Sequence, residues 1–237
     1  MKQILELNLM AVKKQINDSA VLVKRDPTDI KLLAVSKTVD AERVEVMANL
    51  GQTDFAENYV QEGVQKIQAL KDRGLCRGLI WHFIGPLQSN KTRSVAEHFD
   101  WVQTVDRYKI AQRLSEQRPS DLPPLQLCLQ VNIDGGATKS GVDPLGALEL
   151  AKAVSALPNT VLRGLMTIPD PVQGLDAQIR VHERAKMLFE NIKHEIKSER
   201  FDTLSMGMSG DIQAAIAAGS TMVRVGTALF GSRKSAP

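Results

Sequence analysis

The sequence predicts an α/β fold in which eight parallel strands close into a (β/α)8 TIM barrel, with an extra helix at the N-terminus. Eight short apolar runs alternate with longer helical patterns between residues 30 and 227. Several runs are continuously apolar, as in strands covered on both faces. An open doubly wound sheet is the alternative. It usually has fewer strands and a glycine-rich turn after the first, where this chain has Lys37 and Thr38.

The expected elements follow in order along the chain. An amphipathic helix at 2–24 comes first. The eight expected strands are residues 30–36, 53–58, 79–85, 101–105, 125–132, 161–168, 202–208 and 221–227. Between them, Asp40 is placed to cap a helix that stops at Gly51, and Asp143 followed by Pro144 is a favoured helix start. Other helices should begin near Ser89 or Asn90, on Asp106, at 176 and at 211. We expect one domain over 1–237, with a loose tail at 232–237.

Composition excludes several classes of protein. The 237 residues are 43% hydrophobic, which is enough for a core, yet no apolar stretch reaches the roughly 20 residues that span a bilayer. Cys76 and Cys128 are too few for a disulfide framework, so we expect a reducing cytoplasm with Cys128 packed inside a strand. A net charge of +3 with interspersed signs and 4% aromatic residues does not suggest nucleic acid. The four histidines lack metal-ligand spacing, so no metal site is expected.

Polar residues gather where the expected strands end. In parallel barrels, functional groups lie at the C-terminal ends of the strands. The candidates at these positions are Lys37, Asn58, His82, Asp106, Asn132, Thr167, Ser209, Arg224 and Thr227.

Two interpretations of Lys37 stay open from its local sequence. It is either a strand-end lysine that extends its amine to solvent, or a desolvated amine held for chemistry. A desolvated amine is nucleophilic and forms a Schiff base with an aldehyde. The small neighbours Ser36 and Thr38 leave room around it.

Two loops near the C-terminal end of the sequence favour the second interpretation. The stretch "MGMSGD" at 206–211 offers glycines and a hydroxyl before a helix, and Gly226-Thr227 follows the last strand. Barrels often bind phosphate between strands seven and eight. Arg224, if it points into the barrel, needs an acceptor such as an aromatic nitrogen or a carboxylate. An aldehyde, a phosphate and a ring acceptor together describe pyridoxal phosphate.

Five stretches of the sequence form recognisable motifs. They are "LLAVSKT" (32–38), "FAENYVQE" (55–62), "WHFIGPLQSNK" (81–91), "RGLMTIP" (163–169) and "SMGMSGDIQAAIAAGSTMVRVGTALFG" (205–231). In these stretches the chain resembles the pyridoxal phosphate homeostasis proteins, a family related to the barrel domain of alanine racemase (fold type III). The resemblance implies that Lys37 forms an aldimine with pyridoxal 5'-phosphate and that Arg224 contacts the pyridine nitrogen. It further implies that Ser209, Gly226 and Thr227 hold the phosphate. Asn58 would lie near the ring, and Met208 would pack at the site.

Two positions outside these motifs carry open questions. Relatives often have a glutamate where Gly136 stands, so any role of that carboxylate is in doubt here. Lys139 in the same loop is either a solvated lysine or a second contact for an aldehyde or a phosphate. His82 is expected to be a packed, hydrogen-bonded histidine.

The resemblance favours a protein that binds pyridoxal phosphate without strong catalysis and contributes to its homeostasis and to amino-acid and keto-acid balance. Alanine racemase takes its second base from a tyrosine in an extra domain, which we do not expect here; Tyr59 and Tyr108 stand in no such motif. Whether the chain is an enzyme stays open. The alternatives are an amino-acid racemase or lyase with His82 or a group of the substrate as partner base, and a sugar-phosphate barrel enzyme using Lys37. We expect a monomer, with pyridoxal-phosphate-dependent apo-enzymes as recipients.

Overall fold

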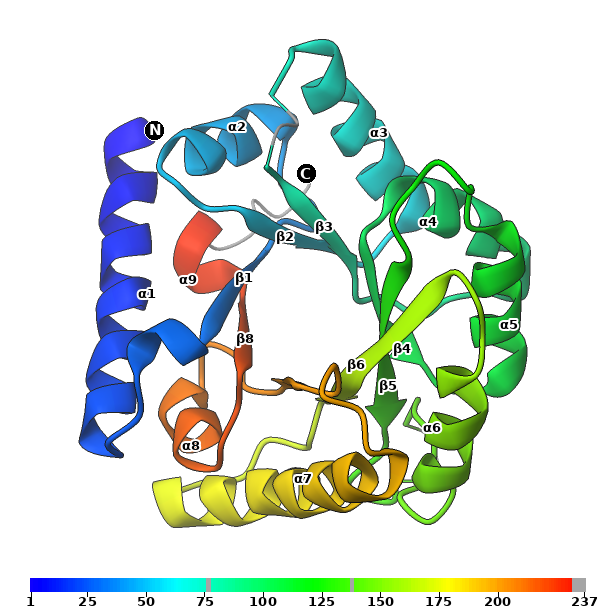
Figure 1. Ribbon diagram of the computed structural model, residues 1–237. Helices are drawn as coiled ribbons and strands as arrows, with labels where there is room; N and C mark the ends of the chain where they lie inside the picture. Colours follow the sequence, from blue (N-terminus) through cyan, green and yellow to red (C-terminus); the bar gives the residue numbers. More distant parts are fainter. Residues whose placement is uncertain (76–77, 137–138, 232–237) are drawn as a thin grey trace.

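Eight parallel strands form a closed barrel in the computed structural model, which describes residues 1–75, 78–136 and 139–231 (Figure 1). Each strand pairs with the next, and β8 pairs with β1, so the predicted barrel is confirmed. The strands are β1 (Lys31–Val35), β2 (Asp54–Glu57), β3 (Ile80–Phe83), β4 (Trp101–Val105), β5 (Leu125–Val131), β6 (Thr160–Thr167), β7 (Thr203–Ser205) and β8 (Met222–Val225). The expected tail 232–237 lies outside the described residues.

Helices surround the barrel. They are α1 (Lys2–Leu22), α2 (Ala41–Asn49), α3 (Val60–Asp72), α4 (Thr92–His98), α5 (Tyr108–Gln117), α6 (Ala147–Ser155), α7 (Leu175–Ile196), α8 (Ile212–Ala217) and α9 (Thr227–Phe230). Short 3-10 turns lie at Pro27–Asp29 and Ser89–Lys91. None of the helices in the described part of the chain is long and apolar enough to cross a bilayer.

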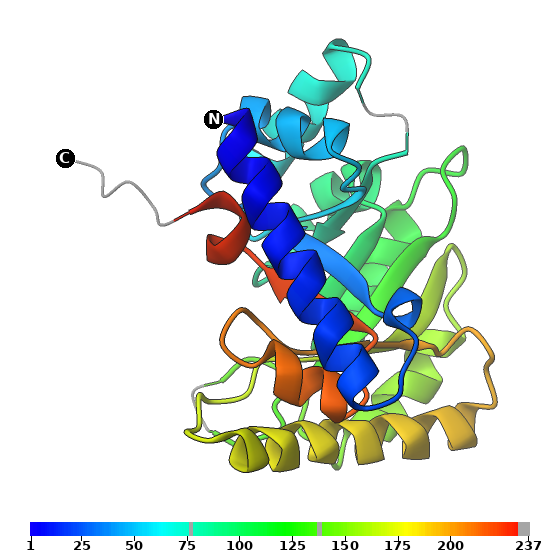
Figure 2. The same ribbon diagram turned by 90° about the vertical axis from the view of Figure 1, so that its left-hand side faces the viewer.

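The N-terminal helix α1 completes the outer layer beside the two shortest helices, α8 and α9 (Figure 2). Its buried face consists of Leu5, Leu9, Val12 and Ile16, which repeat at helical spacing. Asn8 Nδ2 donates to the carbonyl of Leu229 at 2.9 Å and links α1 to α9. A helix of one turn covers little of a strand, so α1 supplies apolar cover that α9 lacks.

Two predicted helix starts are wrong. Asp143 does not cap α6, because its Oδ1 accepts the N–H of Leu145 and the segment forms a turn; the helix begins at Ala147. Asp106 does not cap α5 either, because its Oδ1 pairs with Arg107 Nη1 at 2.7 Å. Asp40 does cap α2 as predicted, since its side chain accepts from the N–H of Arg43.

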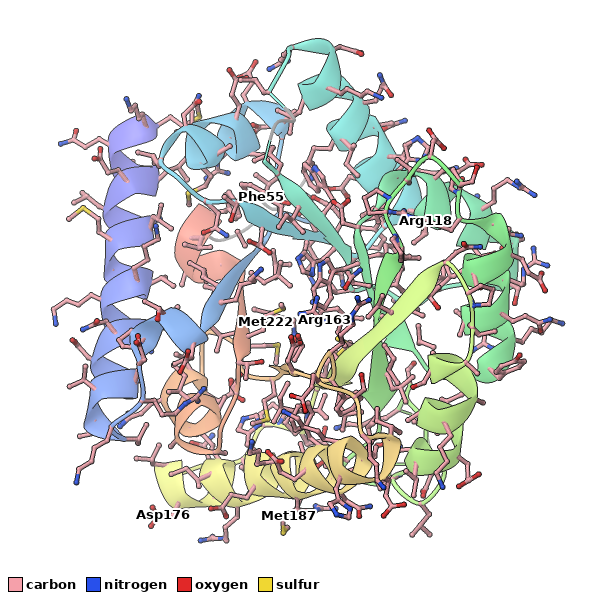
Figure 3. All side chains as sticks on the ribbon, viewed as in Figure 1. Phe55, Arg118, Arg163, Asp176, Met187 and Met222 are labelled. Carbon is pink, nitrogen blue, oxygen red and sulfur yellow. The ribbon has the colours of Figure 1, made fainter. Side chains whose placement is uncertain are left out.

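The strands bury side chains on both of their faces, one toward the helices and one toward the barrel axis. Residues that point outward from the strands, such as Phe55 and Phe83, are fully buried beneath the helices. Residues that point inward include the apolar Leu33, Ala56 and Met222, but also several polar side chains described below. In Figure 3, Met222 lies toward the centre of the ring of strands, whereas Met187 on α7 points away from it.

Candidate functional site at the barrel mouth

The predicted site residues lie at the C-terminal ends of four neighbouring strands, on the face formed by the C-terminal ends of all eight strands, here called the barrel mouth. Lys37 follows β1, Asn58 follows β2, Gly226 and Thr227 follow β8, and Ser209 lies in the loop after β7 (Figure 1). The register pairs Val35 with Ala56 and Ala34 with Val225, which sets the ends of β1, β2 and β8 level. The barrel order β7-β8-β1-β2 therefore brings together residues that are far apart in the sequence.

Lys37 lies in the tight turn that follows β1, and its amine has no bonding partner among the residues that the structure describes. Its side chain is half-buried, and no acceptor or carboxylate in the described part of the chain bonds its Nζ. The following residue, Thr38, has a left-handed backbone (φ 62°), and its N–H donates to Glu62 Oε1 at 2.5 Å. A threonine adopts this conformation rarely, so the turn is held by its surroundings.

A buried ion pair supports the Lys37 turn from the helix side. Glu57 Oε1 accepts from Ser36 Oγ at 2.6 Å and from Lys66 Nζ at 2.6 Å. Lys66 Nζ also donates to the carbonyl of Ser36 at 2.7 Å and reaches Glu62 at 3.1 Å. Burial raises the pKa of Glu57, and the charge of Lys66 opposes that rise. The network was not predicted, although a glutamate at the end of the apolar run 53–58 was its visible signal.

Arg224 points into the barrel, which is one of the two side-chain orientations that the sequence left open. It is 4% exposed, and its Nη1 donates to the carbonyl and to Oγ of Ser205 at 2.8 and 2.9 Å. Its Nη2 donates to the carbonyl of Thr167 at 2.8 Å. Burial lowers the pKa of Arg224 to about 10, so the guanidinium stays charged at neutral pH. Backbone carbonyls are acceptors that the sequence alone did not indicate.

Three uncharged side chains at strand ends have a buried oxygen with no hydrogen-bond partner among the described residues. These oxygens are Asn58 Oδ1 after β2, Asn132 Oδ1 after β5 and Thr167 Oγ1 at the end of β6. An unsatisfied buried polar group costs roughly 1–3 kcal/mol, so such groups are rare unless a ligand or water completes them. Their common position at the mouth indicates that a polar ligand fits there.

The loop after β7 is held in shape by Asp211. Its Oδ1 accepts the N–H of Met208 at 2.6 Å, and its Oδ2 contacts His182 Nε2 at 2.9 Å. Gly207 has a left-handed φ of 95°, and a Cβ there would lie 2.5 Å from Ala215 Cβ. Ser209 at the top of the loop is exposed, with no bonding partner for its hydroxyl within the described ranges.

Met208 is 39% exposed and lines a cavity of about 140 Å³ together with Pro169, Pro171, Val181 and His182. The cavity lies between the β6 loop, the start of α7 and the β7 loop. Met208 therefore lines this cavity in the loop after β7, and its packing against a ligand stays a prediction.

His82 lies away from the mouth. It is the third residue of β3 and fully buried, with Nε2 3.1 Å from Asp54 Oδ1 and Nδ1 3.0 Å from Gln103 Nε2. The expectation of a packed, hydrogen-bonded histidine is confirmed. Its placement at a strand end is wrong, because it lies within β3. Its full burial and the engagement of both ring nitrogens do not favour the suggested role as a partner base.

Lys139 connects two loops rather than pointing freely into solvent. Its Nζ pairs with Asp134 Oδ2 at 2.6 Å and with Asp170 Oδ1 at 2.8 Å, and its side chain is 25% exposed. Partial burial acts to lower the pKa of Lys139, but the hydrogen bonds to Asp134 and Asp170 raise it above its ordinary value. The amine is thus held as an ammonium. Gly136 contributes its carbonyl, which accepts from Asn132 Nδ2 and from the Lys139 N–H.

Cys128 lies inside β5 as predicted. It is a free, fully buried thiol, and burial raises its pKa to about 12. Cys76 lies outside the described residues. No group of three or more potential metal ligands occurs within the described residues.

The structure is a closed parallel barrel with a free lysine after β1. Loops with glycines and a hydroxyl follow β7 and β8. A comparison with known protein families identifies the class of barrel. Residues 7–234 match the sequence model of the alanine racemase N-terminal domain, and the chain belongs to that family.

Within it, the chain belongs to the pyridoxal phosphate homeostasis proteins. It is 51% identical over 229 residues to the pyridoxal phosphate homeostasis protein of Vibrio alginolyticus, covering 97% of each chain. It is 51% identical over 226 residues to the protein of that name from Escherichia coli K12, covering 95% of each.

A solved structure agrees with this assignment. PipY of Synechococcus elongatus with pyridoxal phosphate bound is 35% identical, with a TM-score of 0.79 over 91% of this chain and 100% of that one. An alanine racemase of Clostridium difficile, 17% identical, shares the fold, with a TM-score of 0.76 over 98% of this chain and 58% of that one.

Proposed function

We propose that this protein binds pyridoxal 5'-phosphate covalently through Lys37 and serves its homeostasis without strong catalysis of its own. The observation that carries the proposal is the Lys37 amine, which has no partner among the described residues and follows β1, the neighbour of β8 in the barrel. A free amine next to candidate phosphate loops matches a ligand with an aldehyde and a phosphate. PipY, a relative at 35% identity, has been solved with this ligand bound.

Each proposed contact follows from the chemistry of the side chain. The Lys37 amine condenses with the aldehyde, with loss of one water, to form a Schiff base. Arg224 donates to the pyridine nitrogen, an acceptor. The hydroxyls of Ser209 and Thr227, with the Gly226 backbone, hold the phosphate. Asn58 contributes its unpaired Oδ1 beside the ring, and Met208 packs against the ligand from the β7 loop.

The absorbance spectrum tests the covalent link. Protein loaded with pyridoxal phosphate should show an aldimine band that borohydride reduction removes, and peptide mapping should place the reduced adduct on Lys37. Lys37→Ala should abolish the band. Lys139→Ala is the matched control and should keep it, because Lys139 is paired with two carboxylates. A band that survives in Lys37→Ala would disprove the assignment of this lysine.

Proton exchange separates a binding protein from an enzyme. The absence of strong catalysis predicts that L-amino acids incubated with loaded protein in deuterated water exchange their α-proton only slowly. The pairing of both His82 ring nitrogens with Asp54 and Gln103 supports this, because it leaves that histidine unable to act as a partner base. Exchange at enzyme-like rates would favour the racemase or lyase alternative instead.

We further propose that a monomer in the cytoplasm passes the ligand to apo-enzymes that depend on it. Sedimentation of loaded protein should give the mass of one chain. Mixing it with such an apo-enzyme should restore that enzyme's activity faster than the same concentration of ligand released to solution. Equal rates would argue against direct transfer.

A further inference from the structure

A continuous chain of buried polar side chains runs through the barrel interior beneath the proposed site. Arg224 Nη1 lies 2.9 Å from Ser205 Oγ, and Ser205 Oγ lies 2.7 Å from Gln103 Oε1. Gln103 Nε2 lies 3.0 Å from His82 Nδ1, and His82 Nε2 lies 3.1 Å from Asp54 Oδ1. All five residues are buried, and they come from β8, β7, β4, β3 and β2. Barrel interiors are usually filled by branched apolar side chains.

The two ends of the chain determine the direction of its hydrogen bonds. An arginine can only donate, and an ionised aspartate can only accept. Arg224 donates to Ser205 Oγ, which leaves the Ser205 hydroxyl proton for Gln103 Oε1. Gln103 Nε2 then donates to His82 Nδ1, so His82 carries its proton on Nε2 and donates it to Asp54. Every bond thus points from the mouth toward Asp54.

A second contact supports this orientation of the Gln103 amide. Gln103 Nε2 also lies 3.1 Å from Met222 Sδ, and a thioether sulfur is an acceptor only. With the amide reversed, its oxygen would face that sulfur, and His82 Nδ1 would have to donate to it. His82 would then need protons on both nitrogens to satisfy Asp54 as well. Burial lowers the pKa of His82 and so disfavours that imidazolium.

The chain restrains Arg224 from below. A guanidinium has five N–H donors. Three of them serve the Ser205 carbonyl, the Ser205 hydroxyl and the Thr167 carbonyl. Two donors remain for a ligand. The two carbonyls hold two nitrogens of the guanidinium. The bond to Ser205 Oγ adds a third restraint, and Gln103 orients the hydroxyl that accepts it.

We propose that Gln103 is a positioning residue that, through Ser205, holds the Arg224 guanidinium in one orientation for a ring acceptor at the barrel mouth. Gln103 also holds His82 as the neutral Nε2–H tautomer. The inference rests on the proposed function, because the ring acceptor is the pyridine nitrogen of pyridoxal phosphate. Gln103 contacts no ligand atom in this proposal and acts through Arg224.

Two analogues of pyridoxal phosphate, measured by calorimetry, test the positioning role. Both carry a methyl group in place of the aldehyde, and the second has a benzene ring in place of the pyridine. Gln103→Leu should weaken binding of the first analogue about tenfold, since a poorly oriented charge-assisted hydrogen bond loses that much. It should leave the second analogue within about twofold, because that ring offers Arg224 no acceptor.

Gln130→Leu is the matched control. Gln130 is another glutamine of the barrel strands, 9% exposed, and it bonds to the Ser140 carbonyl outside the chain of five residues. It should leave both analogues within about twofold of the wild type. Equal losses for both analogues in Gln103→Leu, or no loss for either, would overturn the inference. If Gln103→Leu does not fold, Ser205→Ala replaces it, since it breaks the same link.

The tautomer of His82 gives a readout that needs no ligand. Nitrogen NMR of the protein alone should show His82 with its proton on Nε2 at neutral pH, identified by its loss in His82→Gln. A proton on Nδ1, or an imidazolium, would contradict the hydrogen-bond direction. If the wild type binds neither analogue, the proposed function is wrong and the inference falls with it. A wild type that binds while Gln103→Leu is unaffected overturns this inference alone.

Discussion

Single residues inside this barrel carry charges that apolar surroundings would not tolerate unpaired. The Glu57–Lys66 pair, with side chains 0% and 4% exposed, lies directly behind the Lys37 turn. Buried ion pairs need further hydrogen bonds, and Ser36 supplies one to each partner, whereas Glu57 Oε2 has none among the described residues. The turn that carries Lys37 is therefore held by a buried charge pair through Ser36.

Removing Lys66 from the buried pair should lower the stability of the protein. Lys66→Met should destabilise the protein by about 3–5 kcal/mol, because it leaves Glu57 buried without its counter-charge. Lys14→Met is the control, since Lys14 forms an exposed pair with Asp18 and should change stability by less than about 1 kcal/mol. Urea denaturation measures both variants. Similar stabilities for the two would show that the buried pair adds little.

Asp54 makes the stability of the barrel sensitive to acid. Burial acts to raise the pKa of Asp54, but His82, Thr53 and Lys31 lower it to about 2, from an ordinary value of 3.8. A carboxylate with a depressed folded-state pKa stabilises the protein fully above its unfolded pKa. That contribution is lost as pH falls toward about 2.

Asp54→Asn should remove this dependence. The wild type should be more stable than the variant by about 2 kcal/mol at pH 6, and the difference should shrink between about pH 4 and pH 2. Denaturant titrations at pH 6, 4 and 3 measure it. Stability curves that stay parallel over this range would contradict the assigned pKa of Asp54.

At the scale of elements, the loop between β7 and α8 shows how backbone geometry prepares the site. Gly207 adopts a conformation that L-residues rarely take, and its Cα faces Ala215 of α8 too closely for a side chain. Asp211 then closes the loop onto Met208. These local constraints present Ser209 at the mouth.

Gly207→Ala should destabilise the protein by about 1–3 kcal/mol and weaken phosphate-ester binding. Gly210→Ala, three residues on, is the matched control. A Cβ at Gly210 meets nothing within 4 Å and its φ is not left-handed, so the same substitution should cost little. Thermal unfolding and analogue binding measure both. Equal effects at the two positions would mean that chain entropy, rather than strain and overlap, decides the outcome.

At the scale of the whole molecule, the proposed ligand joins the ends of β7, β8, β1 and β2. These strands include the pair at which the barrel closes. A ligand that binds only the folded state adds about 2.7 kcal/mol of stability at a concentration 100 times its Kd. Pyridoxal phosphate should thus raise the Tm by several degrees. Lys37→Ala should shrink the rise, and an unchanged rise would argue that binding does not involve this lysine.

The sequence predicted the strands of this protein better than the starts of its helices. Strand order and number followed from apolar runs whose length and β-branched content suit buried parallel strands, and Trp101–Val105 was predicted to the residue. Helix starts at Asp106 and Asp143 were predicted wrongly. Their carboxylates bond to a neighbouring arginine and to a local turn, and propensity at a single position does not distinguish those partners from a helix cap.

The sequence by itself determined the barrel, the family and the candidate residues of the mouth, because these depend on local patterns and on motifs that are contiguous along the chain. Only the tertiary structure decided what lies behind them. Lys66 of α3 packs back onto Glu57 of β2, which precedes it by nine residues. Gln103 of β4 and Ser205 of β7 meet across the barrel interior although 102 residues separate them. No local signal indicates which inward-facing polar side chains meet, since side-chain direction depends on the strand register and its irregularities.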